Sequence, residues 1–214
     1  MPDREETDVR LPPDDDVIAA LRAGDEATFA ALLDTWSRGM LRVARSYVGT
    51  REIAEEVVQD TWLAVIGAID DFEGRSSLKT WIFRILVNTA KKRGARERRT
   101  VPWSSAFEPG RGPAPEEPPT TLGAPRADGN EPLSRIVPEG EVLASEARER
   151  IWQALAELPV RQRSVIILRD VEGCTSAEVC EILEISPANQ RVLLHRARTA
   201  VRSRLEDYFE AVRR

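Results

Sequence analysis

Residues 171–205 are VEGCTSAEVCEILEISPANQRVLLHRARTAVRSRL, and they carry the strongest local structural signals in the chain. Thr175 and Glu178 have the spacing of a capping box, which predicts a short helix that begins after Thr175. Ser186 followed by Pro187 predicts the start of the next helix, because serine caps a first turn and proline fits its first position. Only about three residues separate the two helices, so the stretch predicts a helix-turn-helix.

The predicted helix-turn-helix, Thr175 to Arg196, would place the start of its second helix in the major groove of duplex DNA. Asparagine and glutamine can pair there with adenine, and arginine with guanine. We expect base contacts first and phosphate contacts further along the helix: Asn189, Gln190 and Arg191, then Arg196, Arg198, Arg202 and Arg204. Arginines on a helix can also form only a solvated face, but the cap, the short turn and the polar triplet together favour DNA contact.

The charge of the chain is unevenly distributed. It has 214 residues with 31 Lys+Arg against 36 Asp+Glu, for a net charge of -5. An acidic protein ordinarily has little affinity for nucleic acid, because phosphate binding comes from Lys and Arg. Residues 75–99, however, contain nine Lys or Arg against one Glu, and residues 191–204 contain five Arg and no acid. We expect weak DNA binding by the chain alone and a partner that presents these two segments.

The first hundred residues have apolar positions at spacings of three and four, which predicts helices. Asp25 and Thr50 are candidate N-caps of two long helices, and Ser76 or Ser77 of another. Residues 101–140 hold nine prolines and five glycines without periodicity, which predicts a linker that spans about 35 Å as a flexible coil. The linker could be a spacer without contacts or could thread through a partner.

These patterns predict an all-α fold of two small helical domains, a helical bundle and a helix-turn-helix bundle, joined by a long proline-rich flexible linker. The predicted divisions are an acidic disordered N-terminus at 1–14, an N-terminal domain at 15–100, the linker at 101–140 and a C-terminal domain at 141–209. The acidic N-terminus and the lack of a long apolar run predict a cytoplasmic protein without membrane insertion. Without a heptad seam, we expect a monomer.

The basic segment 75–99 surrounds Trp81 and begins in a loop of small polar residues. Unpaired bases stack on aromatic rings while Lys and Arg follow the backbone, so this surface suits an opened DNA strand. Its candidate contacts are Arg75, Ser76, Ser77, Lys79, Trp81, Arg84, Asn88, Lys91, Lys92 and Arg96. Trp81 also has core spacing with Leu78 and Ile85, so burial is the alternative to stacking.

The stretch EIAEEVVQDTWLAVI, residues 52–66, has an apolar stripe with acids around it. This helix could bind a helical partner, or could be a plain core helix with an acidic outer face; the candidate partner contacts are Glu55, Glu56, Gln59, Asp60 and Trp62. Nothing in the sequence positions a nucleophile, a metal or a phosphate loop beside these carboxylates, so we expect no enzymatic activity and no cofactor.

Metal and redox chemistry are also poorly supported. Cys174, Cys180 and His195 cannot supply the four ligands of a structural zinc site, so no metal is expected. The two cysteines are expected to be small packing residues or exposed thiols rather than redox sensors.

Several motifs together resemble bacterial sigma factors of the extracytoplasmic-function (ECF) type. They are AEEVVQDTWLAVI, FEGRSSLKTWIFRILVNTAKKRGARER, LPVRQR, LRDVEG and LHRAR, in this order. The resemblance implies that the helix with Glu55, Glu56, Gln59, Asp60 and Trp62 binds core RNA polymerase. It implies that the loop and helix of segment 75–99 recognise and melt the minus-ten promoter element. The helix-turn-helix would then recognise the minus-thirty-five element as duplex, through Ser186, Asn189, Gln190, Arg191, Leu193 and Arg196.

The resemblance also implies an anti-sigma factor that covers the same surfaces. The second helix departs from the commoner family pattern at Asn189, Gln190 and Leu193, so a promoter preference does not carry over. The main alternative is a stand-alone helix-turn-helix regulator that binds an operator as a dimer, and it leaves segment 75–99 unexplained. A DNA-processing enzyme is less favoured, since Tyr47 and Tyr208 both have core spacing.

Overall fold

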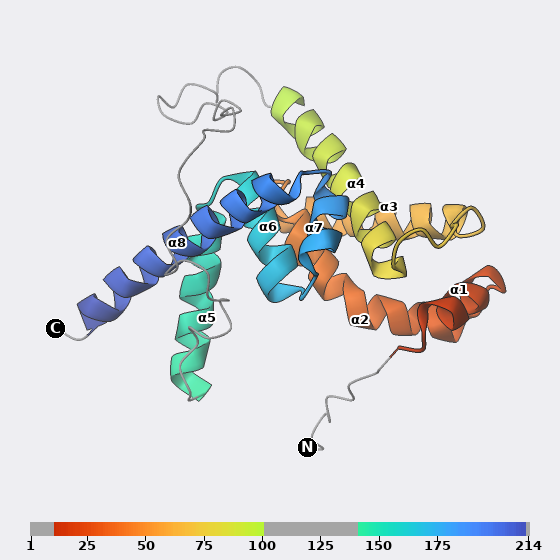
Figure 1. Cartoon of the computed structure of the whole chain (residues 1–214), viewed down its shortest axis with the longest axis horizontal. Helices are drawn as coiled ribbons and strands as arrows, with labels where there is room; N and C mark the ends of the chain where they lie inside the picture. Colours follow the sequence, from red (N-terminus) through yellow and green to blue (C-terminus); the bar gives the residue numbers. More distant parts are fainter. Residues whose placement is uncertain (1–10, 101–140, 213–214) are drawn as a thin grey trace. The chain divides into compact units, whose positions relative to one another are not determined.

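The structure is a computed structural model that describes residues 11–100 and 141–212, and within these ranges it contains helices and turns but no strand (Figure 1). The predicted all-α fold is confirmed. The predicted linker, residues 101–140, lies outside the described residues, as do residues 1–10 of the predicted acidic N-terminus. The chain divides into two compact units at Gly94.

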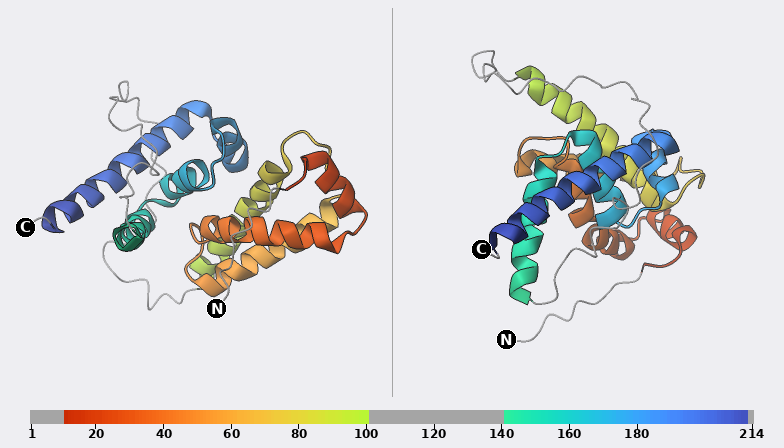
Figure 2. Two further views of the ribbon diagram at one scale, coloured as in Figure 1. Left: turned by 90° about the horizontal axis from the view of Figure 1, so that it is seen from below. Right: turned by 60° about the vertical axis from the view of Figure 1, so that its left-hand side comes forward.

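Among the described residues, the N-terminal unit contains α1 (Asp14–Arg22), α2 (Glu26–Ala44), α3 (Arg51–Ala68) and most of α4 (Leu78–Thr100), whose last six residues lie beyond Gly94. The predicted caps are present, because the Asp25 carboxylate accepts from the Thr28 backbone N–H at 2.8 Å and Thr50 Oγ1 accepts from that of Ile53 at 3.3 Å. Hydrogen bonding with Thr28 also lowers the pKa of Asp25. Helices α2 and α3 pack side by side (Figure 2).

Two details of this unit differ from the sequence-based expectation. The apolar spacing of residues 52–66 would place Ile66 in the core face of α3, but this residue is 54% exposed. On α4 Phe83 and Val87 are buried, whereas the expected core residues Trp81 and Ile85 are only half-buried. The segment WIFRILV is apolar at six of seven positions, so its periodicity does not specify which side faces the core.

The C-terminal unit consists of α5 (Glu141–Ala156), α6 (Val160–Ile166), the π-helical turn η4 (Ile167–Val171), α7 (Ser176–Leu183) and α8 (Pro187–Val212). Helix α8 packs against α5, α6 and α7 (Figure 2). Its apolar residues at spacings of three and four all point into the core: Leu194, Ala197, Val201 and Leu205.

The predicted capping signals of the helix-turn-helix are confirmed. The Thr175 N–H donates to the Glu178 carboxylate at 2.7 Å, and the Glu178 N–H donates to Thr175 Oγ1 at 3.3 Å. Helix α7 ends at Glu184, which adopts a left-handed conformation with φ +57. Ser186 Oγ then accepts from the Asn189 N–H at 3.3 Å and so caps α8.

A buried ion pair joins η4 to α8. The Arg198 guanidinium donates to both carboxylate oxygens of Asp170, through Nε at 2.9 Å and through a terminal nitrogen at 2.6 Å. The two side chains are 7% and 2% exposed. Two parallel charged hydrogen bonds fix the relative orientation of the two elements as well as their distance. The pair therefore fixes α8 against η4.

Candidate nucleic-acid interface

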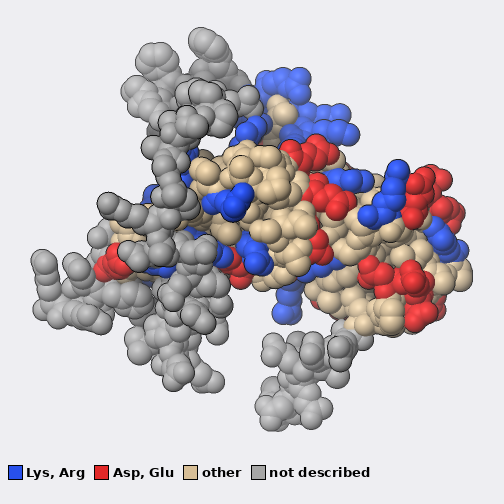
Figure 3. Space-filling model, in the orientation of Figure 1, with Lys and Arg blue, Asp and Glu red and all other residues tan. Residues whose placement is uncertain are grey.

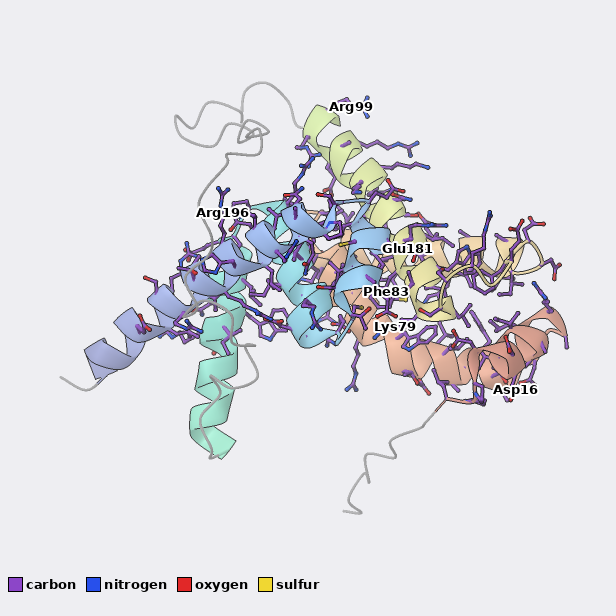
Figure 4. The ribbon with its side chains drawn as sticks, viewed as in Figure 1. Asp16, Lys79, Phe83, Arg99, Glu181 and Arg196 are labelled. Atoms are coloured by element: carbon purple, nitrogen blue, oxygen red, sulfur yellow. The ribbon has the colours of Figure 1, made fainter. Side chains whose placement is uncertain are left out.

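The start of α8 is exposed at Ser186, Pro187 and Ala188. Asn189 is half-buried and Arg191 is exposed, and the Arg191 Nε–H donates to the Pro187 carbonyl at 3.4 Å. Ser186 caps the helix, while Leu193 and Arg196 are half-buried on its sides. Arg196 lies on α8 two turns beyond Asn189 (Figure 4). The predicted contact residues other than Gln190 can therefore approach a ligand.

Gln190 lies inside the protein, which corrects its expected role in base recognition. Its side chain is 1% exposed and its Oε1 accepts from Ser176 Oγ at 3.3 Å. Consecutive residues on a helix point about 100° apart, so Asn189, Gln190 and Arg191 cannot share one face. Among the described residues no partner is found for the buried Nε2 of Gln190.

Val192, rather than Gln190, points away from the core of the unit. The sequence analysis did not identify Val192 as a candidate contact residue. Its side chain is 44% exposed on α8, on the side opposite to Gln190 and Leu194. Helical periodicity would have found it, because a residue two positions after a core residue and two before another must face away from the core.

Arg198 and Arg204, which were expected to contact phosphate, are engaged within the unit. Arg198 is held by Asp170, and Arg204 donates to the Ala154 carbonyl at 3.1 Å while it pairs with Glu157 at 2.9 Å. Their positive charges therefore tie α8 to η4 and α5. The expectation that they neutralise DNA phosphates is corrected for Arg198, whose side chain is buried.

In the N-terminal unit, the loop between α3 and α4, residues 69–77, leads into the basic helix. Phe72 is buried and packs against Trp81, with ring centroids 4.9 Å apart. Gly74 has φ +70, a conformation that favours glycine, and Arg75 beside it is exposed and pairs with Glu73 at 3.0 Å. Ser77 accepts from the Thr80 N–H at 3.1 Å, so of the two candidate caps of α4 the structure selects Ser77.

Side chains of helix α1 form hydrogen bonds with the α3–α4 loop and with the start of α4, and the sequence analysis did not predict these bonds. The Arg22 guanidinium donates to the carbonyls of Ile69, Asp70 and Phe72, at 3.3, 3.4 and 2.7 Å. At the other end of α1, Asp14 accepts from the Leu78 N–H at 2.7 Å and so caps α4. Asp14 thus belongs to the folded unit rather than to a disordered N-terminus. Contacts between residues this far apart have no local sequence signal.

Helix α4 presents basic side chains along its length. Lys79 lies over the Phe83 ring, 5.8 Å from its centroid, one turn away on the same helix (Figure 4). Arg84 and Asn88 are half-buried, and Lys91, Lys92 and Arg96 are exposed. Lys and Arg gather at the C-terminal end of α4 (Figure 3). Trp81 is half-buried, which lies between the two alternatives expected for it, burial in the core and exposure for stacking.

A shallow apolar groove lies between α2 and α3. It is lined by Phe29, Leu33, Glu55, Val58, Gln59, Trp62, Leu63 and Ile66. Leu63 and Ile66 are 63% and 54% exposed, whereas Trp62 is 5% exposed and packs edge-on against Phe29 with centroids 5.6 Å apart. Trp62 therefore forms the floor of the groove and the two aliphatic residues form its accessible part.

Glu55 and Gln59 are the polar residues that line this groove. Glu55 accepts from Arg51 Nε at 2.7 Å, and Glu56 pairs with Arg93 of α4. Gln59 and Asp60 are exposed on the same helix. An apolar strip with an acidic margin suits a helical partner that carries apolar and basic residues.

No metal-binding cluster of His, Cys, Asp and Glu occurs among the described residues. Cys174 is buried, and burial raises the pKa of the Cys180 thiol. No described helix combines the length and apolar character required to span a membrane.

The sequence matches models of two protein regions. Residues 32–100 match Sigma-70 region 2, and residues 148–201 match Sigma-70, region 4. Together the two matches cover more than half of the chain. The chain belongs to the sigma-70 family. The region 2 match includes the α3–α4 loop, α4 and the lining of the α2–α3 groove except Phe29, and the region 4 match includes the helix-turn-helix.

The relatives described next, which are similar to this chain in sequence, are ECF sigma factors. The ECF RNA polymerase sigma-E factor of Haemophilus influenzae is 26% identical over 194 residues, which is 90% of this chain and 95% of that protein. The protein of the same name from Escherichia coli K12 is 26% identical over 191 residues, or 89% and 93%. The resemblance to ECF sigma factors is confirmed, and the chain is a promoter-directing sigma factor rather than a stand-alone regulator. Sigma factors are non-catalytic initiation factors.

Two solved structures share the fold. CnrH, in complex with the cytosolic domain of CnrY, aligns with a TM-score of 0.56 at 22% identity, over 91% of this chain and 97% of that chain. The sigma factor RpoE of Bartonella quintana, in complex with the anti-sigma factor NepR, aligns with a TM-score of 0.54 at 23% identity, over 83% and 96%.

Proposed function

We propose that this sigma factor divides promoter recognition between its two units. The α3–α4 loop and α4 bind the opened minus-ten strand through Arg75, Ser76, Ser77, Lys79, Trp81, Arg84, Asn88, Lys91, Lys92 and Arg96. Helix α8 recognises the minus-thirty-five duplex through Asn189, Arg191, Leu193 and Arg196, with Ser186 at its cap. The observation that carries this proposal is the pair of chemically different surfaces: a loop and helix with a partly accessible tryptophan among cations, and an exposed helix start after a tight turn. Stacking suits single strands, and a helix suits the major groove.

The α2–α3 groove is the proposed site for core RNA polymerase. Exposed Leu63 and Ile66 supply apolar area, while Glu55, Gln59 and Asp60 supply a polar margin and Glu56 is shared with Arg93. RpoE of Bartonella quintana is bound to the anti-sigma factor NepR and CnrH to the cytosolic domain of CnrY, which supports a protein partner of the anti-sigma kind for this chain as well. The chain would act in the cytoplasm, where polymerase is present, as a monomer without catalytic activity or cofactor of its own.

Run-off transcription from fragmented genomic DNA tests the proposal. Core polymerase with the full chain should give starts at defined sites that share two sequence motifs about two helical turns apart, and core polymerase alone should not. The Asn189→Ala variant should give about tenfold less transcript from promoters with the matching base and nearly unchanged transcript from other promoters. The Lys92→Ala variant should lower the transcript yield from all promoters. It should also reduce the dependence of promoter binding on salt concentration by the amount of about one phosphate contact.

Arg38→Ala, an exposed cation on α2, is the matched control and should leave both readouts unchanged. Equal losses for Asn189→Ala and Lys92→Ala across all promoters would contradict the division of roles. Absence of specific starts, with protection of a palindromic duplex by the chain alone, would contradict the function itself.

A further inference from the structure

The outward face of α8 has an apolar centre. Gln190, Leu194 and Ala197 are buried on one side of the helix, so the positions about 180° away face solvent. The residues at these positions are Ala188, Val192 and Thr199, and all three are exposed. Among the described side chains of α8, Val192 is the one large apolar residue that is exposed.

The surroundings of Val192 identify the kind of molecule that would cover it. Asn189 and Arg196 border it on adjacent turns, and Arg191 and Arg202 add positive charge to the same helix, whereas Arg198 and Arg204 are paired with Asp170 and Glu157. This charge favours a polyanion. A single valine beside one exposed alanine offers too little apolar area to anchor a protein, because protein interfaces depend on clustered aromatic and apolar anchors. In the major groove the apolar feature of matching size is the 5-methyl group of thymine.

We propose that Val192 selects thymine at one position of the upstream promoter element by contact with its 5-methyl group. The inference rests on the proposed recognition of duplex DNA by α8, and specifies Val192 and thymine as one contact pair within it. Asn189 and Arg196 would pair with neighbouring bases or phosphates, and Val192 would exclude water from the methyl group between them. Cytosine lacks this methyl group, so the contact discriminates a T·A pair from a C·G pair without a hydrogen bond.

Deoxyuridine substitution tests this proposal, because deoxyuridine differs from thymidine by the methyl group alone. Holoenzyme assembled from the full chain and core polymerase first selects duplexes from a library randomised over the upstream element. Each thymine of the selected element is then replaced in turn by deoxyuridine. At one thymine the replacement should weaken holoenzyme binding about three- to fivefold, the scale of one buried methyl group. Val192→Ala should weaken binding to the thymine duplex by a similar factor and bind both duplexes equally.

Val160→Ala is the matched control, since Val160 is 39% exposed at the start of α6 in the same unit, and this variant should retain the preference for thymine. The proposal is overturned if no thymine replacement changes binding, if the selected element contains no thymine, or if Val192→Ala weakens both duplexes by the same factor. A holoenzyme that enriches no upstream sequence would instead contradict the recognition of duplex DNA by α8.

Discussion

Gln190 shows how one residue's orientation changes its expected role. Its amide is buried. The Oε1 atom accepts a hydrogen bond from Ser176, and the Nε2 atom has no hydrogen-bond partner among the described residues. A buried polar group without a hydrogen bond costs about 1–3 kcal/mol. The residue therefore fills space in the core between α7 and α8, while its unpaired amide nitrogen lowers the stability of the unit.

Replacement of Gln190 by methionine, which has a similar shape, should leave the free energy of unfolding unchanged or raise it by about 1 kcal/mol. Promoter preference should not change, since the side chain does not reach the DNA. Urea denaturation measures the first quantity and sequence selection by the holoenzyme measures the second. Asn189→Ala is the comparison, with an altered preference at one base and a nearly unchanged stability. A relaxed preference in Gln190→Met would restore Gln190 as a base contact.

At the scale of elements, helix α1 controls the geometry of the α3–α4 loop. Arg22 binds three carbonyl groups of the loop, and Asp14 caps the helix that follows it. Carbonyl groups after the end of a helix lack intrahelical donors, so a guanidinium that serves three of them fixes the path of the chain there. A short N-terminal helix thus positions the loop that we assign to strand capture.

Arg22→Ala should lower binding of the holoenzyme to promoter DNA with a single-stranded minus-ten region about tenfold, the scale of one charged hydrogen bond. Binding to the upstream duplex should not change, because the loop does not take part in it. Fluorescence anisotropy with the two DNA probes separates these effects. Arg38→Ala is again the control. Equal weakening on both probes would mean that Arg22 only stabilises the unit as a whole.

At the scale of the whole molecule, each unit has its own core. Leu32 is fully buried in the N-terminal unit, and the Asp170–Arg198 ion pair is buried in the C-terminal unit. Two separate cores predict two unfolding transitions that respond independently to mutation.

Leu32→Ala should lower one transition temperature in scanning calorimetry by about 8 °C or more, as a large-to-small core substitution does in a unit of this size. Asp170→Ala should lower the other, since it leaves the Arg198 charge buried without its partner at a cost of about 3–5 kcal/mol. Each variant should leave the second transition in place. A single transition that both variants shift together would show that the units unfold as one.

Local signals in the sequence determined the positions of the helices. The capping pair Thr175 and Glu178, the Ser186 cap and the Asp25 and Thr50 caps all act within one helical turn, so each can be recognised without knowledge of the rest of the chain. The order of the motifs likewise predicted the family.

Only the tertiary structure decided which side chains are available at each surface. Arg22 meets the Phe72 carbonyl across 50 residues, and Arg198 meets Asp170 across 28. Such partners depend on how helices pack, and no local pattern encodes them. The same packing turned Gln190 inward and left Val192, Leu63 and Ile66 exposed. The sequence therefore determined where helices form and what chemistry they carry, while packing decided which of their faces remain open to DNA and polymerase, because burial depends on neighbours distant in the chain.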